Sequence, residues 1–223
     1  MRTNMKKLAA LLLAVLMLMS AAGCSVVKDT LAQTLVQGNF DAVYLNKADD
    51  NYLKLVDTDK EGIEELYMDG LEASAEGFAY YFDISYLTDE VEAEIIDLYK
   101  EILAKTKYTV GDASQVNDTT YAVSVTFEPL DIFELVIDEF DALLDRFNEK
   151  YSDVDAEALT EEQYMEIDAD YAAMVIELVR SKLPEAGYGD PETMLINVEC
   201  KNDVWSISES SFADFDAKLI VYP

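Results

Sequence analysis

Residues 121–130 read YAVSVTFEPL, and this short stretch decides the class of fold that the sequence predicts. Large apolar side chains alternate with small or polar ones, which is the period of a β-strand with one buried face. The large apolar positions are Tyr121, Val123, Val125 and Phe127. Pro129 follows at once, and proline cannot donate a hydrogen bond within a sheet, so we expect the strand to end there.

The sequence on either side of this stretch predicts two hairpins. Upstream, residues 108–110 predict a first strand, joined to the quoted one through turn-forming residues at 117–118. Near the C-terminus, residues 193–201 and 204–208 predict a second hairpin with a turn of Asn and Asp between its strands. A tail with apolar Phe and Leu residues follows.

Helical periodicity fills the chain before the first hairpin. A helix over about 26–37 is expected to stop at Gly38, because glycine is favoured just past a helix end, and Asn39 then predicts the cap of a short second helix. A capping box headed by Thr58 predicts the start of a third helix, and Thr88 that of a fourth.

Two more amphipathic helices are predicted between the hairpins, from Asp131 to about Lys150 and from Thr160 to about Leu183. The second begins with a capping box of Thr160 and Gln163. Helices first and hairpins later indicate an α+β fold, in which N-terminal helices pack on a curved antiparallel sheet. The pair at 131–185 is expected to be an insertion between the hairpins.

This order of elements resembles the ketosteroid-isomerase-like cone fold, also called the nuclear-transport-factor-like or cystatin-like cone, found in many Gram-positive lipoproteins. The residues that carry the likeness are QGNF at 37–40, YTVGDA at 108–113, the quoted stretch at 121–130 and DVWSI at 203–207. The resemblance implies a cup on the concave face of the sheet, which the insertion could plug or cover. The implied lining residues are Tyr121, Val123, Val125, Phe127, Val198, Cys200 and Trp205.

The N-terminus has the three-part layout of a secretory signal peptide. Basic residues at 2, 6 and 7 precede the twelve apolar residues 8–19, and small residues follow. A bilayer-spanning helix needs about 18 apolar residues, so this run is too short to span.

The residues Ala21-Ala22-Gly23-Cys24 resemble a lipobox, the processing motif of bacterial lipoproteins, although lipoboxes usually carry Leu where Ala21 stands. The resemblance implies a signal peptide at 1–23, a diacylglyceryl group on the Cys24 sulfur, and one mature domain at 24–223. Two acyl chains suffice for stable anchoring, so we expect a cell-membrane protein held by lipid on the outer, extracytoplasmic face. The alternative is a plain signal peptide in which Cys24 is incidental.

Lipidation of Cys24 would leave Cys200 as a single thiol in this chain of two cysteines. Cys200 shares a strand face with Ile196 and Val198, which predicts a small core residue. A thiolate nucleophile would need a neighbouring histidine or cation, and the chain has no histidine.

Composition limits the partners of the protein. There are 46 acidic residues against 16 Lys and Arg, a net charge of −30, which repels nucleic acid and anionic headgroups. An apolar fraction of 51% argues against disorder and for a folded domain with an acidic surface. The surface is either simply solvated or attracts cations or a basic partner.

The sequence contains no complete metal or cofactor motif. Asp57, Asp59 and Glu61 begin like a calcium loop, but Met68 stands where a bidentate Glu is required. A second acidic loop at 153–157 fails in the same way, and the absence of histidine removes a Ser-His-Asp triad. A row of acids on one predicted helix face indicates a solvated surface: Glu134, Asp138, Asp141 and Asp145.

We therefore expect a non-enzymatic lipoprotein that binds a protein or small ligand at the cell envelope, with no cofactor. The first alternative is an enzyme that uses an acid and a tyrosine in an isomerase-like cup, which would need a buried Asp or Glu. The second is a structural envelope protein without a discrete ligand.

Overall fold

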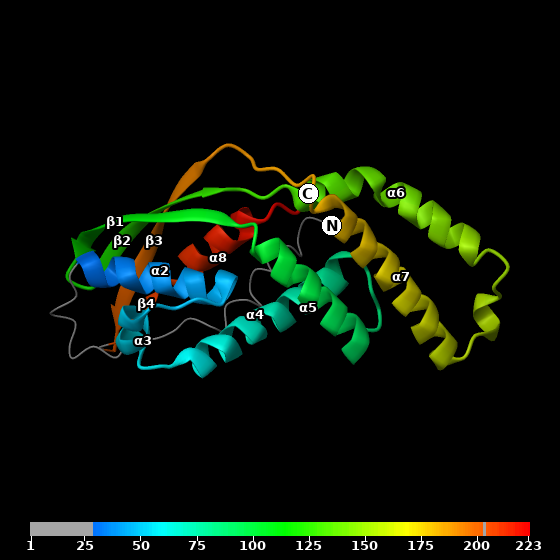
Figure 1. Cartoon of the computed structure of the whole chain (residues 1–223), viewed down its shortest axis with the longest axis horizontal. Coiled ribbons are helices and arrows are strands. Elements are labelled where there is room, and N and C mark those ends of the chain that lie inside the picture. The colour runs from blue at the N-terminus through cyan, green and yellow to red at the C-terminus, as the bar shows by residue number, and fades with distance from the viewer. Residues whose placement is uncertain (1–28, 203) are drawn as a thin grey trace.

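The computed structural model describes residues 29–202 and 204–223, in which helices cover one face of a four-stranded antiparallel sheet (Figure 1). The elements in chain order are α2 (Asp29–Leu45), α3 (Asp50–Val56), α4 (Lys60–Tyr81), α5 (Asp89–Leu103), β1 (Lys107–Asn117), β2 (Thr120–Glu128), α6 (Ile132–Lys150), the short 3-10 helix η2 (Ala156–Ala158), α7 (Glu161–Lys182), β3 (Glu192–Lys201), β4 (Val204–Ile207) and α8 (Glu209–Leu219). The predicted α+β fold is confirmed.

The sheet has the order β1-β2-β3-β4, and the quoted stretch forms one of its two inner strands. Val123 pairs with Ile196 of β3, and Val125 pairs with Val110 of β1. The register between β1 and β2 shifts just after Val110, a bulge that bends the strand and increases its twist. The sheet is thus curved and open, and α6 and α7 lie between β2 and β3 in sequence, as predicted.

The concave face of the sheet is filled by α2 and α8 (Figure 1). Phe40 of α2 stacks on Phe215 of α8 with ring centroids 4.5 Å apart, and Phe215 meets the edge of Phe127 on β2 at 5.0 Å. All three side chains are almost fully buried. The inward residues of the strands therefore form core, and the cup that the resemblance implied is filled by α2 and α8.

Helix α2 runs through the point where the sequence predicted a break. Gly38 lies inside the helix, and a Cβ on it would come within 2.1 Å of the Tyr52 ring. The glycine therefore allows α3 to approach α2 closely, and it does not end a helix. Asn39 is likewise no cap: it is fully buried, and neither side-chain atom of its amide has a hydrogen-bond partner within the described part of the chain.

Two of the predicted helix caps are confirmed. Thr88 accepts a hydrogen bond from the Val91 amide, and Thr160 forms the expected capping box with Gln163. The third predicted start is displaced by one residue, because Asp59 caps α4 in place of Thr58. Asp59 therefore acts as a helix cap, a position that suits a carboxylate because the N-terminal end of a helix is partially positive.

Helices α6 and α7 form an antiparallel hairpin that extends away from the sheet (Figure 1). The Asp168 carboxylate of α7 accepts hydrogen bonds from the Ser85 and Tyr86 amides, in the loop between α4 and α5, at 3.0 and 2.8 Å. The Tyr171 hydroxyl donates to the Phe82 carbonyl at 2.8 Å. These bonds fix the base of the hairpin against the helical layer, so the insertion adds length to the molecule and does not fill the concave side of the sheet.

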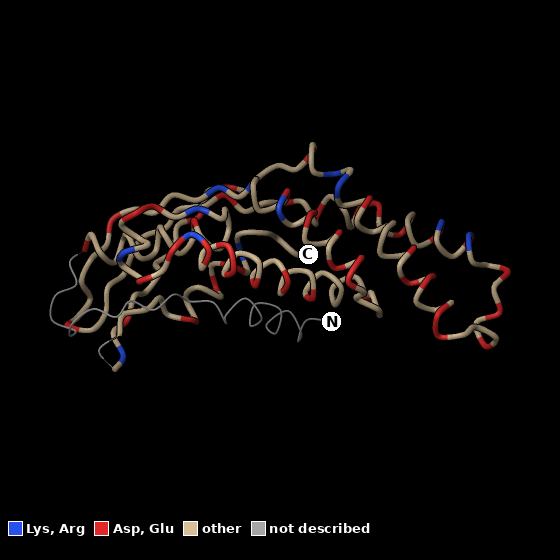
Figure 2. The backbone as a smooth tube through the Cα atoms, turned by 60° about the horizontal axis from the view of Figure 1, so that its bottom comes forward, with Lys and Arg blue, Asp and Glu red and all other residues tan. Residues whose placement is uncertain are grey.

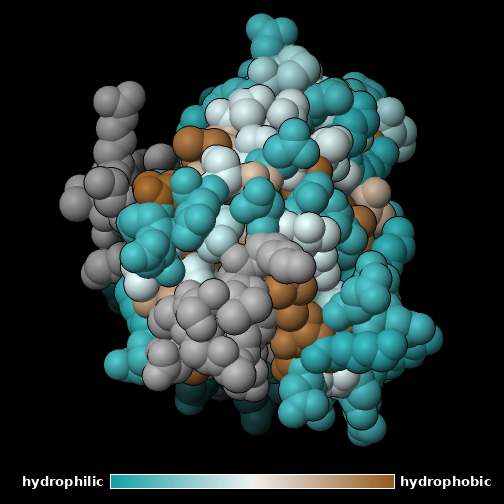
Figure 3. All heavy atoms as spheres, turned by 90° about the vertical axis from the view of Figure 1, so that its left-hand side faces the viewer, coloured by the Kyte–Doolittle hydropathy of each residue, from teal (hydrophilic) through white to brown (hydrophobic). Residues whose placement is uncertain are grey.

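Acidic residues recur along the outer faces of the helices (Figure 2). The sheet end of the molecule is largely hydrophilic, with a narrow hydrophobic strip (Figure 3). In the part of the chain that the structure describes, no helix is long and apolar enough to cross a membrane.

Candidate functional site

A cavity of about 170 Å³ lies among α2, α4, α5, α8 and the C-terminal tail. One wall is made of small residues on α4 at helical spacing: Gly70, Ala73, Ser74 and Gly77. Larger side chains close the other sides, including Tyr44 of α2, Leu103 of α5 and Ile220 of the tail. The small wall opposite large ones leaves the space unfilled.

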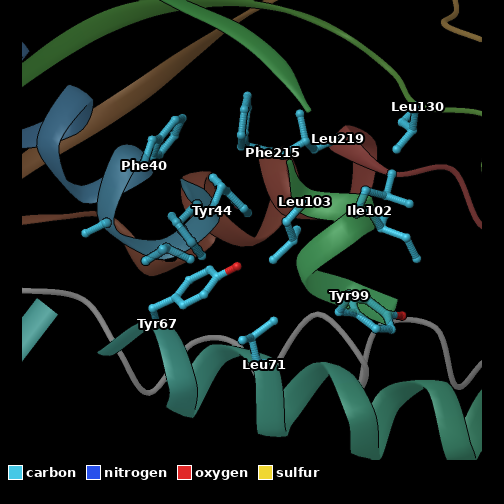
Figure 4. Close-up of a cluster of buried hydrophobic side chains, with 14 of the residues drawn as sticks. Phe40, Tyr44, Tyr67, Leu71, Tyr99, Ile102, Leu103, Leu130, Phe215 and Leu219 are labelled. Atoms are coloured by element: carbon cyan, nitrogen blue, oxygen red, sulfur yellow. The ribbon is translucent and has the colours of Figure 1, made fainter. Parts of the chain in front are cut away.

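Figure 4 shows a cluster of buried side chains that includes three residues of the cavity wall, Tyr44, Tyr99 and Leu103. Tyr44 points down from α2, Leu103 and Tyr99 come from α5, and Leu71 comes up from α4 below. Ala217 of α8 is exposed and lines the cavity, which indicates that the space reaches the surface beside α8.

One carboxyl group lines this apolar space. Asp216 of α8 is half-buried, and its Oδ1 accepts a hydrogen bond of 2.9 Å from the Tyr44 hydroxyl. Burial raises the pKa of Asp216 to about 6, and the bond from Tyr44 offsets part of that rise. The group is therefore ionised for most molecules at neutral pH, yet it is paired with no Lys or Arg among the described residues.

Three further tyrosines line the cavity and are held by hydrogen bonds to the protein. The hydroxyls of Tyr99 and Tyr222 bond to each other, and the Tyr81 hydroxyl donates to the Pro223 carbonyl at 3.2 Å. Burial raises the pKa of all three above the ordinary tyrosine value. These hydroxyls are therefore neutral at physiological pH.

The tail that carries Tyr222 is held by backbone bonds. The Leu130 amide donates to the Leu219 carbonyl, and the Val221 amide donates to the Leu130 carbonyl, both at 2.9 Å. Tyr222 also stacks on Phe133 at the start of α6, with ring centroids 4.3 Å apart. The tail is thus a fixed wall of the cavity, positioned by the residues that follow β2.

This site differs from the predicted one, in which the acid was expected on the strands. None of the seven implied cup residues lines the cavity, and no residue of the insertion at 131–185 does either. Asp216 has no distinctive signal in the sequence, because Asp214 and Lys218 stand beside it in the same segment. That segment forms α8, which was not predicted as a helix.

Cys24, the predicted lipidation site, lies outside the described residues. Cys200 lies on β3, is 9% exposed and belongs to the core as predicted, but it is disulfide-bonded. The prediction of a single thiol at Cys200 is therefore wrong for this structure.

The acidic row on α6 is solvent-exposed at all four positions, Glu134, Asp138, Asp141 and Asp145. Over residues 29–202 and 204–223, no group of three or more His, Cys, Asp or Glu side chains is placed to hold a metal ion. The cavity around Asp216 is therefore the strongest candidate site.

The structure defines an α+β class of domain, with helices covering a curved sheet and a helical hairpin between its second and third strands. Residues 36–214 match the family model described as a domain of unknown function, DUF5105, and the chain belongs to this family.

A solved structure supports the same fold. It is that of YcdA from Bacillus subtilis subsp. subtilis strain 168, provisionally described as a lipoprotein. The two share 14% sequence identity with a TM-score of 0.54, over 84% of this chain and 55% of the Bacillus chain. The chain thus spans about half the length of that protein, and the likeness is one of fold. A search of curated proteins found no match.

Proposed function

We propose that the protein is a lipoprotein anchored through Cys24 on the outer face of the cell membrane, where its α+β domain binds a ligand. Two observations support the anchor: the signal-like leader ends in Ala-Ala-Gly-Cys, and a protein of the same fold is described as a lipoprotein. The cavity around Asp216 carries the binding role, because apolar pockets with a few polar groups are the usual form of ligand sites.

The anchor is tested by expressing the full chain in a Gram-positive host and separating membrane from soluble fractions. We expect the wild type and Cys200→Ala in the membrane fraction and Cys24→Ala in the soluble fraction. Intact-mass analysis then reports on the sulfur directly. A diacylglyceryl adduct supports the proposal, whereas an unlipidated chain that is two hydrogens lighter than its reduced form contradicts it.

A second function is favoured by one observation, the contact between Asp216 and Tyr44. An acid with a raised pKa and neutral tyrosine hydroxyls in one cavity are the groups that a proton-transfer enzyme requires. In that role the Asp216 carboxylate would take a proton from carbon next to a carbonyl, and a tyrosine hydroxyl would stabilise the resulting enolate oxygen.

This enzymatic alternative is tested by NMR of cyclohexanone in deuterated buffer, with purified protein present. An enzyme of this class would accelerate deuterium exchange at the carbons beside the carbonyl, and Asp216→Asn would abolish the acceleration. Exchange that is equally slow with wild type and Asp216→Asn contradicts the alternative and leaves the binding role in place.

A further inference from the structure

Most hydroxyl groups around the cavity already donate their protons to other groups of the protein. Tyr44 donates to Asp216, Tyr81 donates to the Pro223 carbonyl, and the Ser74 hydroxyl donates to the Gly70 carbonyl at 2.8 Å. The hydroxyls of the two remaining tyrosines, Tyr99 and Tyr222, bond to each other, which uses one of their two protons. A ligand therefore meets the carboxylate, phenolic lone pairs and a single phenolic proton, so most of the polar groups open to it are acceptors.

Asp216 is the strongest of these acceptors. Its Oδ1 receives the Tyr44 proton, and no hydrogen bond to its Oδ2 is recorded within the ranges that the structure describes. A charged group away from water is normally paired, because leaving it unpaired costs free energy. The pocket therefore contains a carboxylate that is complementary to a cation, and residues 29–202 and 204–223 supply none.

The walls suit a cation of organic rather than metallic type. Tyr44, Tyr81, Tyr99 and Tyr222 all line the cavity. The faces of tyrosine rings attract ammonium groups, and the apolar side chains between them favour a ligand with a hydrocarbon part. A metal ion would need several oxygen ligands, and one carboxylate among aromatic rings does not provide them.

The volume limits the size of that ligand. The cavity measures about 170 Å³, and a cavity of about 150 Å³ is known to hold one benzene molecule. The available space therefore fits a single ring with one or two further non-hydrogen atoms, or an aliphatic group of similar bulk.

We propose that this pocket binds a small protonated amine attached to a compact apolar group, with the ammonium at Asp216 and the apolar part against the small residues of α4. The inference rests on the binding role proposed above and adds the chemical class of the ligand.

The test uses three probes of one shape and different charge: benzylammonium, benzyl alcohol and benzoate. Calorimetric titration of the purified mature protein at pH 7.5 in physiological salt measures each affinity. We expect benzylammonium to bind at least about tenfold more tightly than benzyl alcohol, because a charge-assisted hydrogen bond replaces a neutral one, and benzoate not to bind.

Two variants on the same helix localise the effect. Asp216→Asn keeps the size of the side chain and removes its charge, and it should abolish the preference for benzylammonium. Asp214→Asn removes one charge from an exposed position two residues away and should leave the preference unchanged. Thermal melts of both variants show that they are folded, and Ala73→Leu, which adds bulk to the small wall, should weaken binding of every probe.

The pH dependence gives an independent readout. The groups that face Asp216 are Tyr44 from α2, Tyr99 from α5 and Tyr222 from the tail, all neutral below pH 9, so Asp216 alone titrates in the acidic range. Benzylammonium binding should therefore weaken as the pH falls through about 6. If benzylammonium instead bound to carboxylates on the acidic surface, Asp216→Asn would not change its affinity.

Three results would overturn the inference. Equal affinity for benzylammonium and benzyl alcohol refutes the ammonium preference while leaving a ligand pocket in place. Equal loss in Asp214→Asn and Asp216→Asn assigns the effect to surface charge. If no probe binds to wild-type protein whose lipid adduct is verified by mass, the ligand class is refuted. The proposed lipid anchor is not affected by that result.

Discussion

Asp216→Asn should stabilise the protein at neutral pH, because it removes a carboxylate whose ionised form is disfavoured in the fold. Burial displaces the pKa of Asp216 from 3.8 to about 6. One pKa unit corresponds to about 1.4 kcal/mol. The displacement therefore limits the increase in free energy of unfolding caused by Asp216→Asn to about 3 kcal/mol. The side chain is half-buried, and solvent screening reduces the expected gain to about 1–2 kcal/mol.

The sign follows from proton linkage. Between pH 4 and 6 the folded protein retains the Asp216 proton and the unfolded chain has released it. The contribution of Asp216 to the free energy of unfolding therefore becomes less favourable as the pH rises. Below pH 4 both states are protonated, and above about 6 the full cost is present. The difference in free energy of unfolding between Asp216→Asn and wild type should therefore grow across this window and then level off.

Urea denaturation monitored by circular dichroism at pH 4, 5, 6 and 7.5 measures that difference, with Asp214→Asn as the control for net charge. Other carboxylates titrate in both proteins and cancel in the comparison. A difference that is constant with pH, or that decreases as the pH rises, would refute the account of Asp216. A difference matched by Asp214→Asn would assign the effect to the overall charge of this acidic protein.

Three further predictions concern the fold. Gly38→Ala places a Cβ about 2.1 Å from the Tyr52 ring, and it should lower the free energy of unfolding by about 1–3 kcal/mol in a urea titration. The control is Gly189→Ala, which should change the free energy of unfolding little because the nearest atom to its Cβ is 3.6 Å away. Thr160→Ala removes the cap of α7 and should cost about 1 kcal/mol, with Thr160→Ser close to wild type. Asp168→Ala should speed hydrogen exchange at the two loop amides that it binds, by about tenfold or more, while amides of β2 stay protected; unchanged exchange at the loop would contradict the role given to Asp168.

The strands and most helices could be predicted from the sequence because their signals are local. Alternation at 121–127 marks a strand with one buried face, and the side chain of Thr160 marks a helix start through bonds that span only three residues. The order of these elements then indicated helices on an antiparallel sheet, with a helical hairpin at 131–185. Each of these inferences needs only near neighbours along the chain.

The failures share a different cause, since each depends on contacts between distant segments. Gly38 has the residue type of a helix end, but the ring of Tyr52 from α3 requires a glycine there for reasons of space. Asp216 looks like one of many surface acids until Tyr44, 172 positions away, is placed beside it. Periodicity could show which faces are apolar, but it could not show that α8 returns to fill the concave side of the sheet.

The Tyr44–Asp216 contact also determines when the pocket can form during synthesis and folding. Its two residues come from opposite ends of the chain, so a growing polypeptide contains the whole sheet and the α6–α7 hairpin before it contains a pocket. A ligand cannot serve as a template for earlier folding steps. It can only bind to the finished chain and stabilise it, by an amount that grows with the logarithm of the ligand concentration relative to its dissociation constant.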